Sequence, residues 1–234
     1  MKKKFNTKVI HAGHGSDKET GAVMPPIHLS STFKQIEPGN FEYEYARTKN
    51  PSRDVLEKLL AQIESGHKAF AFASGMSAIN TVCDLFGTNF HIICSDDVYG
   101  GTRRLFDKVK SDIEVTYIDF DKNVNWNDEI KENTKFIWVE TPSNPLMKII
   151  DIKNTVSIAS EFNLPVICDN TFASPFNQRP LELGADMVVS SSTKYLGGHS
   201  DIVGGSIVIK ENKEYAEKIS YIQNAVGAIP SPFD

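Results

Sequence analysis

Residues 164–170 read LPVICDN, and residues 185–198 read ADMVVSSSTKYLGG. In each stretch a short apolar run ends in polar side chains, Asp169 in the first and the residues up to Lys194 in the second. Apolar runs that have no polar residue at alternate positions are typical of parallel strands that are covered on both faces. Because ligands bind at the carboxyl ends of such strands, we expect Asp169 and Lys194 to lie at one edge of a sheet.

From residue 51 onward, similar strands alternate with helical patterns. The expected strands cover 68–74, 90–97, 113–120, 135–142, 164–170 and 185–192, and the expected helices cover 51–66, 78–86, 102–110, 155–163 and 213–226. Ser52 is the expected N-cap of the first helix. This alternation predicts an α/β fold of three layers with a mainly parallel sheet. Residues 1–50 have no sustained period and are expected to form an extended N-terminal arm, which leaves 51–234 as the large domain.

Composition excludes several classes of protein. The 234 residues carry a net charge of -5, so they offer no basic surface for nucleic acid. No apolar run reaches the roughly 18 residues that span a bilayer, and the N-terminus lacks the apolar segment of a secretory signal. The three widely spaced cysteines indicate reduced core thiols, and neither they nor the histidines have the spacing of metal ligands. We therefore expect a cytoplasmic protein without a metal site.

Polar clusters follow most of the expected strands. Lys194, after an apolar strand, is a candidate for Schiff-base chemistry, because a partly desolvated lysine shifts toward its neutral amine. An aspartate at a strand end, such as Asp169, is often a turn former or a magnesium or ribose ligand, whereas beside a pyridine nitrogen it keeps that nitrogen protonated. The Ser74-Gly75-Met76 turn opens a helix, and helix N-terminal amides favour a phosphate. These clusters predict a site for a phosphorylated heterocycle.

Other residue types leave alternatives open. Tyr99 is suited to stacking on a planar ring, although a partly buried tyrosine at a strand end often has only a structural role. Arg47, beside Tyr45 on the arm, has the fork that binds phosphate, but a surface arginine is the commoner case. Residues 191–194 also match the SxxK of serine acyl-enzyme hydrolases. That motif opens a helix and is accompanied by SDN and KTG elements, which this sequence lacks.

Six stretches together resemble one family. They are FEYEYARTKNPSR (41–53), FAFASGMSAI (70–79), DDVYGGTRRLF (96–106), ETPSNP (140–145), VICDNTFASPFNQRPLELGAD (166–186) and SSTKYLGGHSDIVGG (191–205). In these the chain is similar to the cystathionine γ-synthase, γ-lyase and β-lyase group, the Cys/Met metabolism enzymes of fold-type I pyridoxal-phosphate proteins. The resemblance implies a three-layer large domain and pyridoxal 5'-phosphate as cofactor.

The resemblance also implies a role for each candidate residue. Lys194 would carry the cofactor as an internal aldimine, and Asp169 would pair with its pyridinium nitrogen. The phosphate would be bound by Ser74, Gly75, Met76, Ser191 and Thr193. Tyr99 would stack on the ring and act as acid or base; Asn144 and Thr171 would lie beside the cofactor, and Arg104 near the substrate. Tyr45 and Arg47 would reach the phosphate of a neighbouring subunit, which implies a homodimer or homotetramer.

The implied activity is elimination or replacement on sulfur amino acids, of the cystathionine γ-lyase or γ-synthase type. Family members are close to 400 residues long, so we expect the small C-terminal domain to be absent here. The helix over 213–226 would lead into that domain, and its stripe of Ala216, Ile219, Ile222 and Val226 would then be left uncovered. The alternative is a truncated remnant that binds the cofactor, or one half of a split enzyme.

Overall fold

The computed structural model of the chain describes residues 4–120, 122 and 124–234. Its centre is a seven-stranded sheet with the order β1-β7-β6-β5-β4-β2-β3. The strands are β1 (Lys68–Phe72), β2 (Phe90–Ser95), β3 (Ile113–Ile118), β4 (Thr134–Glu140), β5 (Val166–Asp169), β6 (Met187–Ser190) and β7 (Gly205–Ile209). Strands β2 to β6 pair in parallel, whereas β7 pairs antiparallel with both β1 and β6. The expected mainly parallel sheet is confirmed.

The helices fill the connections between these strands. They are α1 (Phe5–His11), α2 (Pro51–Ile63), α3 (Gly75–Phe86), α4 (Gly100–Arg104), which continues as a π-helical turn over Leu105–Val109, α5 (Trp126–Glu129), α6 (Ile152–Glu161), α7 (Ser174–Asn177) and α8 (Lys213–Val226). Each of the four longest begins at a side chain that accepts an N–H of its first turn: Asn50, Ser74, Asp151 and Asn212.

Asn50, and not Ser52 as we expected, is the N-cap of α2. The Asn50 side-chain oxygen accepts the Ser52 N–H at 2.8 Å. Pro51 suits the first helical position because its missing N–H would have no acceptor within the helix, so the cap falls one residue earlier. The Ser52 hydroxyl accepts the His28 N–H at 2.9 Å instead and thereby ties the arm to α2.

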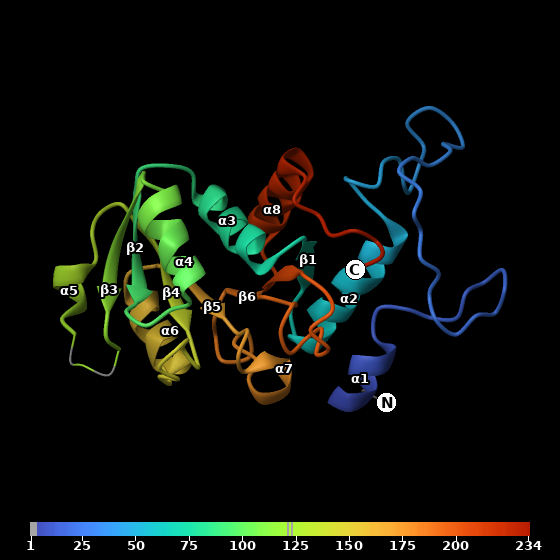
Figure 1. The fold of residues 1–234 in the computed structure, drawn as a ribbon. Coiled ribbons are helices and arrows are strands. Elements are labelled where there is room, and N and C mark those ends of the chain that lie inside the picture. The colour runs from blue at the N-terminus through green and yellow to red at the C-terminus, as the bar shows by residue number, and fades with distance from the viewer. Residues whose placement is uncertain (1–3, 121, 123) are drawn as a thin grey trace.

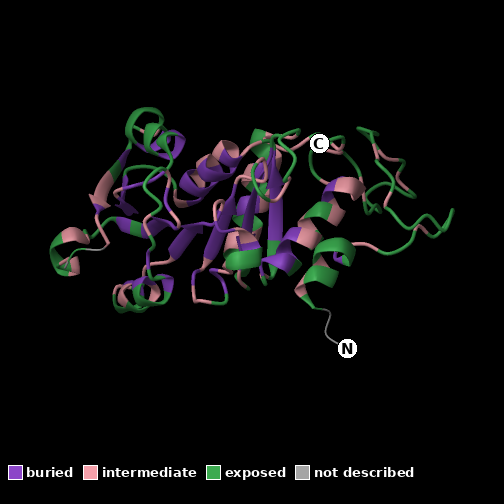
Figure 2. Ribbon diagram, turned by 60° about the horizontal axis from the view of Figure 1, so that its bottom comes forward, coloured by how far each residue is buried: buried purple, intermediate pink, exposed green. Residues whose placement is uncertain are grey.

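Helices cover both faces of the sheet, which gives the expected three layers (Figure 1). On one face α3, the α4 segment and α8 contribute to a core that includes Phe72 and Trp138. On the other face α2 packs over β1, β6 and β7, and α6 packs over β4 and β5. Figure 2 shows buried segments running through the sheet and an exposed arm. This arrangement leaves the strand ends as the place where polar side chains gather.

Helix α8 is covered by the chain itself, contrary to our expectation of an open apolar stripe. Ile219 is fully buried in the same core as α3, and Ala216 and Ile222 pack against that core. Val226, at the end of the stripe, is exposed. The physical reason is that α3 lies beside α8, so that the apolar faces of the two helices meet (Figure 1).

The arm has little regular structure apart from α1, which the sequence pattern did not predict. Helix α1 packs beside α2, and the Phe5 ring lies 5.9 Å from that of Phe176 between ring centres. Between α1 and α2 the regular pairings are isolated bridges, among them Thr32 with Tyr45. This segment runs outside the body of the molecule (Figure 1). A domain boundary at residue 50 stays a prediction.

Candidate active site

The carboxyl ends of β4, β5 and β6 meet at one edge of the sheet. Glu140 and Asp169 are the last residues of β4 and β5 and are direct partners in the ladder. Strand β1 runs in the same direction as β6 because both pair antiparallel with β7. The turn from β1 into α3, which contains Ser74, therefore reaches the same edge, as expected for ligand binding in such a sheet.

A cavity of about 230 Å³ opens at this edge. It is lined by Ser74, Gly75, Met76, Ile79, Tyr99, Glu140, Asn144, Asp169, Thr171, Phe172, Val189, Ser191, Thr193, Lys194 and Val203. All the expected cofactor-binding residues except Tyr45 and Arg47 are in this set. The structure thus brings together residues from well-separated segments of the chain, and the role of each stays a prediction.

One end of the cavity is suited to an anion. The Ser74 hydroxyl accepts the Ser77 N–H at 3.0 Å and caps α3. The amides of Gly75 and Met76 have no acceptor within the helix, and they carry the positive end of its dipole. A Cβ on Gly75 would lie 2.8 Å from the Ser191 Cβ, so only glycine lets the two segments approach this closely. Amides and hydroxyls in this arrangement fit a phosphate group.

A second end of the cavity holds two buried carboxyl groups. Burial raises the pKa of Glu140 to about 8, and the neighbouring charge of Asp169 acts in the same direction. Burial also raises the pKa of Asp169, against the effect of the Thr171 N–H that it accepts at 3.0 Å. Each charge disfavours the other, so this end of the cavity favours a bound cation. A protonated pyridine nitrogen fits that requirement.

Lys194 lines the cavity from the turn that follows β6. Its backbone N–H donates to the Ser191 carbonyl at 3.2 Å, and its side chain is exposed. The lysine thus lies in a turn at the cavity and not in the buried strand. Since residues 191–194 form a turn, they also lack the helix that the serine-hydrolase alternative requires.

Three expected residues do not line the cavity. The Arg47 guanidinium lies 5.3 Å from the Tyr45 ring centre and donates to the backbone carbonyl and the side-chain oxygen of Asn224, near the end of α8. Arg104 is exposed on the last turn of α4. The expectation that Tyr45 and Arg47 act on a neighbouring subunit is not tested by a single chain.

The cavity also contains residues that we did not assign to the site. These are Ile79, Glu140, Phe172, Val189 and Val203. Glu140 belongs to one of the polar clusters that follow strands, but its relation to Asp169 depends on strand register. The apolar members carry no chemical signal in the sequence, because apolar residues of this kind occur throughout the core.

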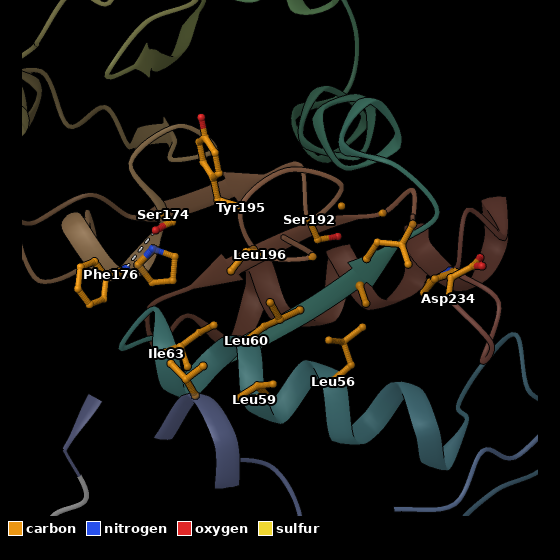
Figure 3. Close-up of a pocket in the computed structure, with 18 of the residues that line it drawn as sticks. Leu56, Leu59, Leu60, Ile63, Ser174, Phe176, Ser192, Tyr195, Leu196 and Asp234 are labelled. Atoms are coloured by element: carbon orange, nitrogen blue, oxygen red, sulfur yellow. Dashed lines mark hydrogen bonds between the residues drawn. The ribbon is translucent and has the colours of Figure 1, made fainter. Parts of the chain in front are cut away.

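A second, more apolar cavity of about 480 Å³ is lined by residues of α2, α7 and the 192–205 segment (Figure 3). Its walls include Leu56, Leu60 and Phe176. Ser192 lines this cavity, whereas Ser191 and Thr193 line the first one. Successive side chains of this turn, Ser191, Ser192 and Thr193, thus line the two cavities alternately.

Among the described residues, no cluster of three acidic, histidine or cysteine side chains is placed to hold a metal. No helix among them has the length and apolarity to cross a membrane.

Comparison with known proteins identifies the family. The model of the Cys/Met metabolism PLP-dependent enzymes matches residues 6–234. The chain belongs to this family. Its cofactor is pyridoxal phosphate, and the anion end and the carboxyl end of the cavity fit that group.

Individual members of the family are closely similar. The chain is 48% identical to the cystathionine beta-lyase of Coxiella burnetii, over 100% of the chain and 61% of that protein. It is 48% identical to a probable cystathionine gamma-synthase of Herpetosiphon aurantiacus, over 98% of the chain and 73% of that protein. The crystal structure of cystathionine gamma-lyase from Lactobacillus plantarum, complexed with L-serine, matches 99% of the chain and 61% of that structure with a TM-score of 0.94 and 47% identity. The chain thus spans about 61% of the length of several of these relatives.

Replacement of Gly205 by alanine is expected to damage both the fold and the anion end. A Cβ at Gly205 would lie 2.2 Å from the Ser74 carbonyl oxygen and 2.7 Å from the Gly75 nitrogen, so backbone must move. We expect Gly205→Ala to lower the free energy of unfolding in urea by about 3 kcal/mol. Gly15→Ala, where an added Cβ meets nothing within 4 Å, is the control. Equal stability of the two variants would contradict this packing.

Proposed function

We propose that this chain forms the cofactor site of an enzyme that catalyses elimination or replacement on sulfur amino acids, of the cystathionine lyase or γ-synthase type. The observation that carries the proposal is the cavity that gathers Lys194, Asp169, Tyr99 and the N-terminus of α3. When bound, pyridoxal phosphate supplies a conjugated ring that accepts the electrons released when a bond at the substrate Cα breaks.

We assign the other roles in this function to residues of the chain. Lys194 would provide the amine that holds the cofactor and, when that amine is free, would move the Cα proton of the substrate. Asp169 holds the pyridine nitrogen in its protonated form. The amides of Gly75 and Met76 bind the phosphate together with the hydroxyls of Ser74, Ser191 and Thr193. These assignments are consistent with a single cavity wall that contains both the anion-binding groups and the acidic groups.

Four further residues belong to the proposed site. Tyr99 would stack on the ring and is a candidate acid or base for proton shifts at the substrate. Asn144 and Thr171 would bind the cofactor from the same cavity wall. Arg104 is not in the cavity wall, so its proposed place near the substrate rests on the family alone.

We further propose that the enzyme is a cytoplasmic homodimer or homotetramer with shared active sites. Tyr45 and Arg47 are exposed and lie outside their own chain's cavity, which is consistent with contact to the phosphate of a neighbour, for which Arg47 would exchange its hydrogen bonds to Asn224. Large apolar side chains on the arm, such as Val23 and Ile36, are exposed, as is typical of a surface that meets another protein. The three cysteines are free and buried, which is consistent with a reducing compartment.

Turnover of cystathionine by the purified chain with added pyridoxal phosphate tests this function. We expect a 2-oxo acid to accumulate: 2-oxobutyrate from γ-elimination, or pyruvate from β-elimination. Replacement activity is assayed by joining cysteine to an activated homoserine ester. A chain that acquires the visible absorption of a lysine-bound cofactor but catalyses none of these reactions contradicts the proposed activity and leaves the alternative of a cofactor-binding remnant.

A further inference from the structure

Glu140 connects two loops that face the cavity. It ends β4, and only 5% of the residue is exposed. One side-chain oxygen accepts the backbone N–H of Tyr99 at 2.9 Å, and the other accepts the backbone N–H of Asn144 at 2.9 Å. Tyr99 precedes α4, whereas Asn144 lies in the connection after β4. A single carboxyl group thus fixes both segments at their backbones.

The same two loops are joined a second time farther from the cavity. Asp97, which is buried, accepts the hydroxyl of Ser143 and the N–H of Leu146, the latter at 2.9 Å. Asp97 lies two residues before Tyr99, and Ser143 and Leu146 flank Asn144. The Asp97 contacts hold the loops together, so the contacts of Glu140 are left to set how Tyr99 and Asn144 lie at the cavity itself.

We propose that Glu140 is a positioning residue that holds Tyr99 and Asn144 in place on the cofactor cavity through both of its side-chain oxygens. This inference rests on the proposed function, in which Tyr99 and Asn144 contact the cofactor. It assigns Glu140 no direct chemistry. Its effect on the cofactor passes through the backbones of two residues that line the same cavity.

Both oxygens are needed for this arrangement. A carboxyl group retains acceptor capacity on its two oxygens, whereas a glutamine has one oxygen and one nitrogen that only donates. In Glu140→Gln, the side-chain nitrogen would face a backbone N–H, so one of the two loops loses its partner and meets another donor. A buried N–H left without a partner is costly, so that loop is expected to move. Glutamine has nearly the same volume, and the change therefore leaves packing intact.

Glu64→Gln is the matched control. Like Glu140, Glu64 is buried; it follows α2, and its carboxyl accepts the side-chain N–H of Asn170 at 3.3 Å. Unlike Glu140, it does not line the cavity. One oxygen suffices for that contact. Both variants remove a buried carboxyl group, so a general effect of doing so appears in both. An effect confined to Glu140→Gln comes from the loops.

The experiment compares cofactor binding by the two variants and the wild-type chain. Pyridoxal phosphate is titrated into each protein, and its affinity and the circular dichroism of the bound cofactor are recorded. We expect Glu140→Gln to bind about ten-fold more weakly, which corresponds to about 1.4 kcal/mol, and to lose most of the induced signal. Glu64→Gln should behave as the wild type. Equal affinity and equal signal in all three proteins would overturn the proposal, whereas failure of the wild type to bind would contradict the proposed function.

A double-mutant cycle with Tyr99→Ala asks whether Glu140 acts through the tyrosine. The loss of affinity for pyridoxal phosphate caused by Glu140→Gln should be smaller in the Tyr99→Ala background, because one of the two side chains that Glu140 positions is already missing. Full additivity would show that Glu140 does not act through Tyr99.

Should Glu140→Gln not fold, amide hydrogen exchange in the wild-type chain still decides the question. The Tyr99 and Asn144 amides should exchange far more slowly than that of Gly100, whose N–H lies at the start of α4. Fast exchange at both amides would overturn the proposal without any variant.

Discussion

Lys194→Ala is expected to abolish the visible absorption that the chain acquires with pyridoxal phosphate. The lysine lines the same cavity as the anion-binding groups and the buried carboxyl groups, so its amine is the nucleophile that we propose to hold the cofactor. Without the amine, covalent attachment is lost. Turnover should fall by at least about 10³-fold, because in the proposed function the same amine moves the Cα proton.

Lys213→Ala is the control for this result. The Lys213 side chain is 89% exposed at the start of α8 and does not line the cavity. It should keep the absorption band and the activity of the wild type. A Lys194→Ala protein that retains the band would show that another lysine carries the cofactor.

Asp169→Asn should have the second largest effect on activity. Asparagine keeps the shape of the side chain and still accepts the Thr171 N–H, which Asp169 accepts at 3.0 Å. It removes the negative charge that, in the proposed function, keeps the pyridine nitrogen protonated. The loss of one such preorganised electrostatic contact lowers kcat by about 10² to 10³-fold.

The same variant should not be less stable than the wild type. Burial raises the pKa of Asp169, which means that folding disfavours its charged form. A neutral asparagine avoids that penalty, so thermal unfolding should occur at the same or a higher temperature. Asp151→Asn, which replaces the N-cap of α6 by an equally good cap, is the control for activity. If Asp169→Asn turned over within two-fold of the wild type, Asp169 would not be the partner of the cofactor.

The sheet and most of the cavity were predictable because they depend on local signals. The buried runs of β4, β5 and β6 are apolar at nearly every position, and each ends in polar residues. In a parallel sheet, these ends meet at one edge whatever the details of packing. Asp169 and Lys194 could therefore be expected in one site.

Features that depend on distant pairings could not be predicted. The GSIVI run of β7 lies between β1 and β6, and nothing near it in the sequence specifies that antiparallel position. Likewise, Glu140 becomes a site residue only through its register with Asp169 and its reach to two loops. The coverage of α8 depends on α3, and the exposure of Lys194 depends on the turn after β6.

Reduction with borohydride followed by peptide mapping tests the central claim most directly. Borohydride fixes the cofactor on the lysine that carries it. After incubation of the chain with pyridoxal phosphate and reduction, we expect one pyridoxyl group on the peptide that contains Lys194 and unmodified lysines elsewhere. A label spread over surface lysines, or placed on a single lysine other than Lys194, would contradict the account.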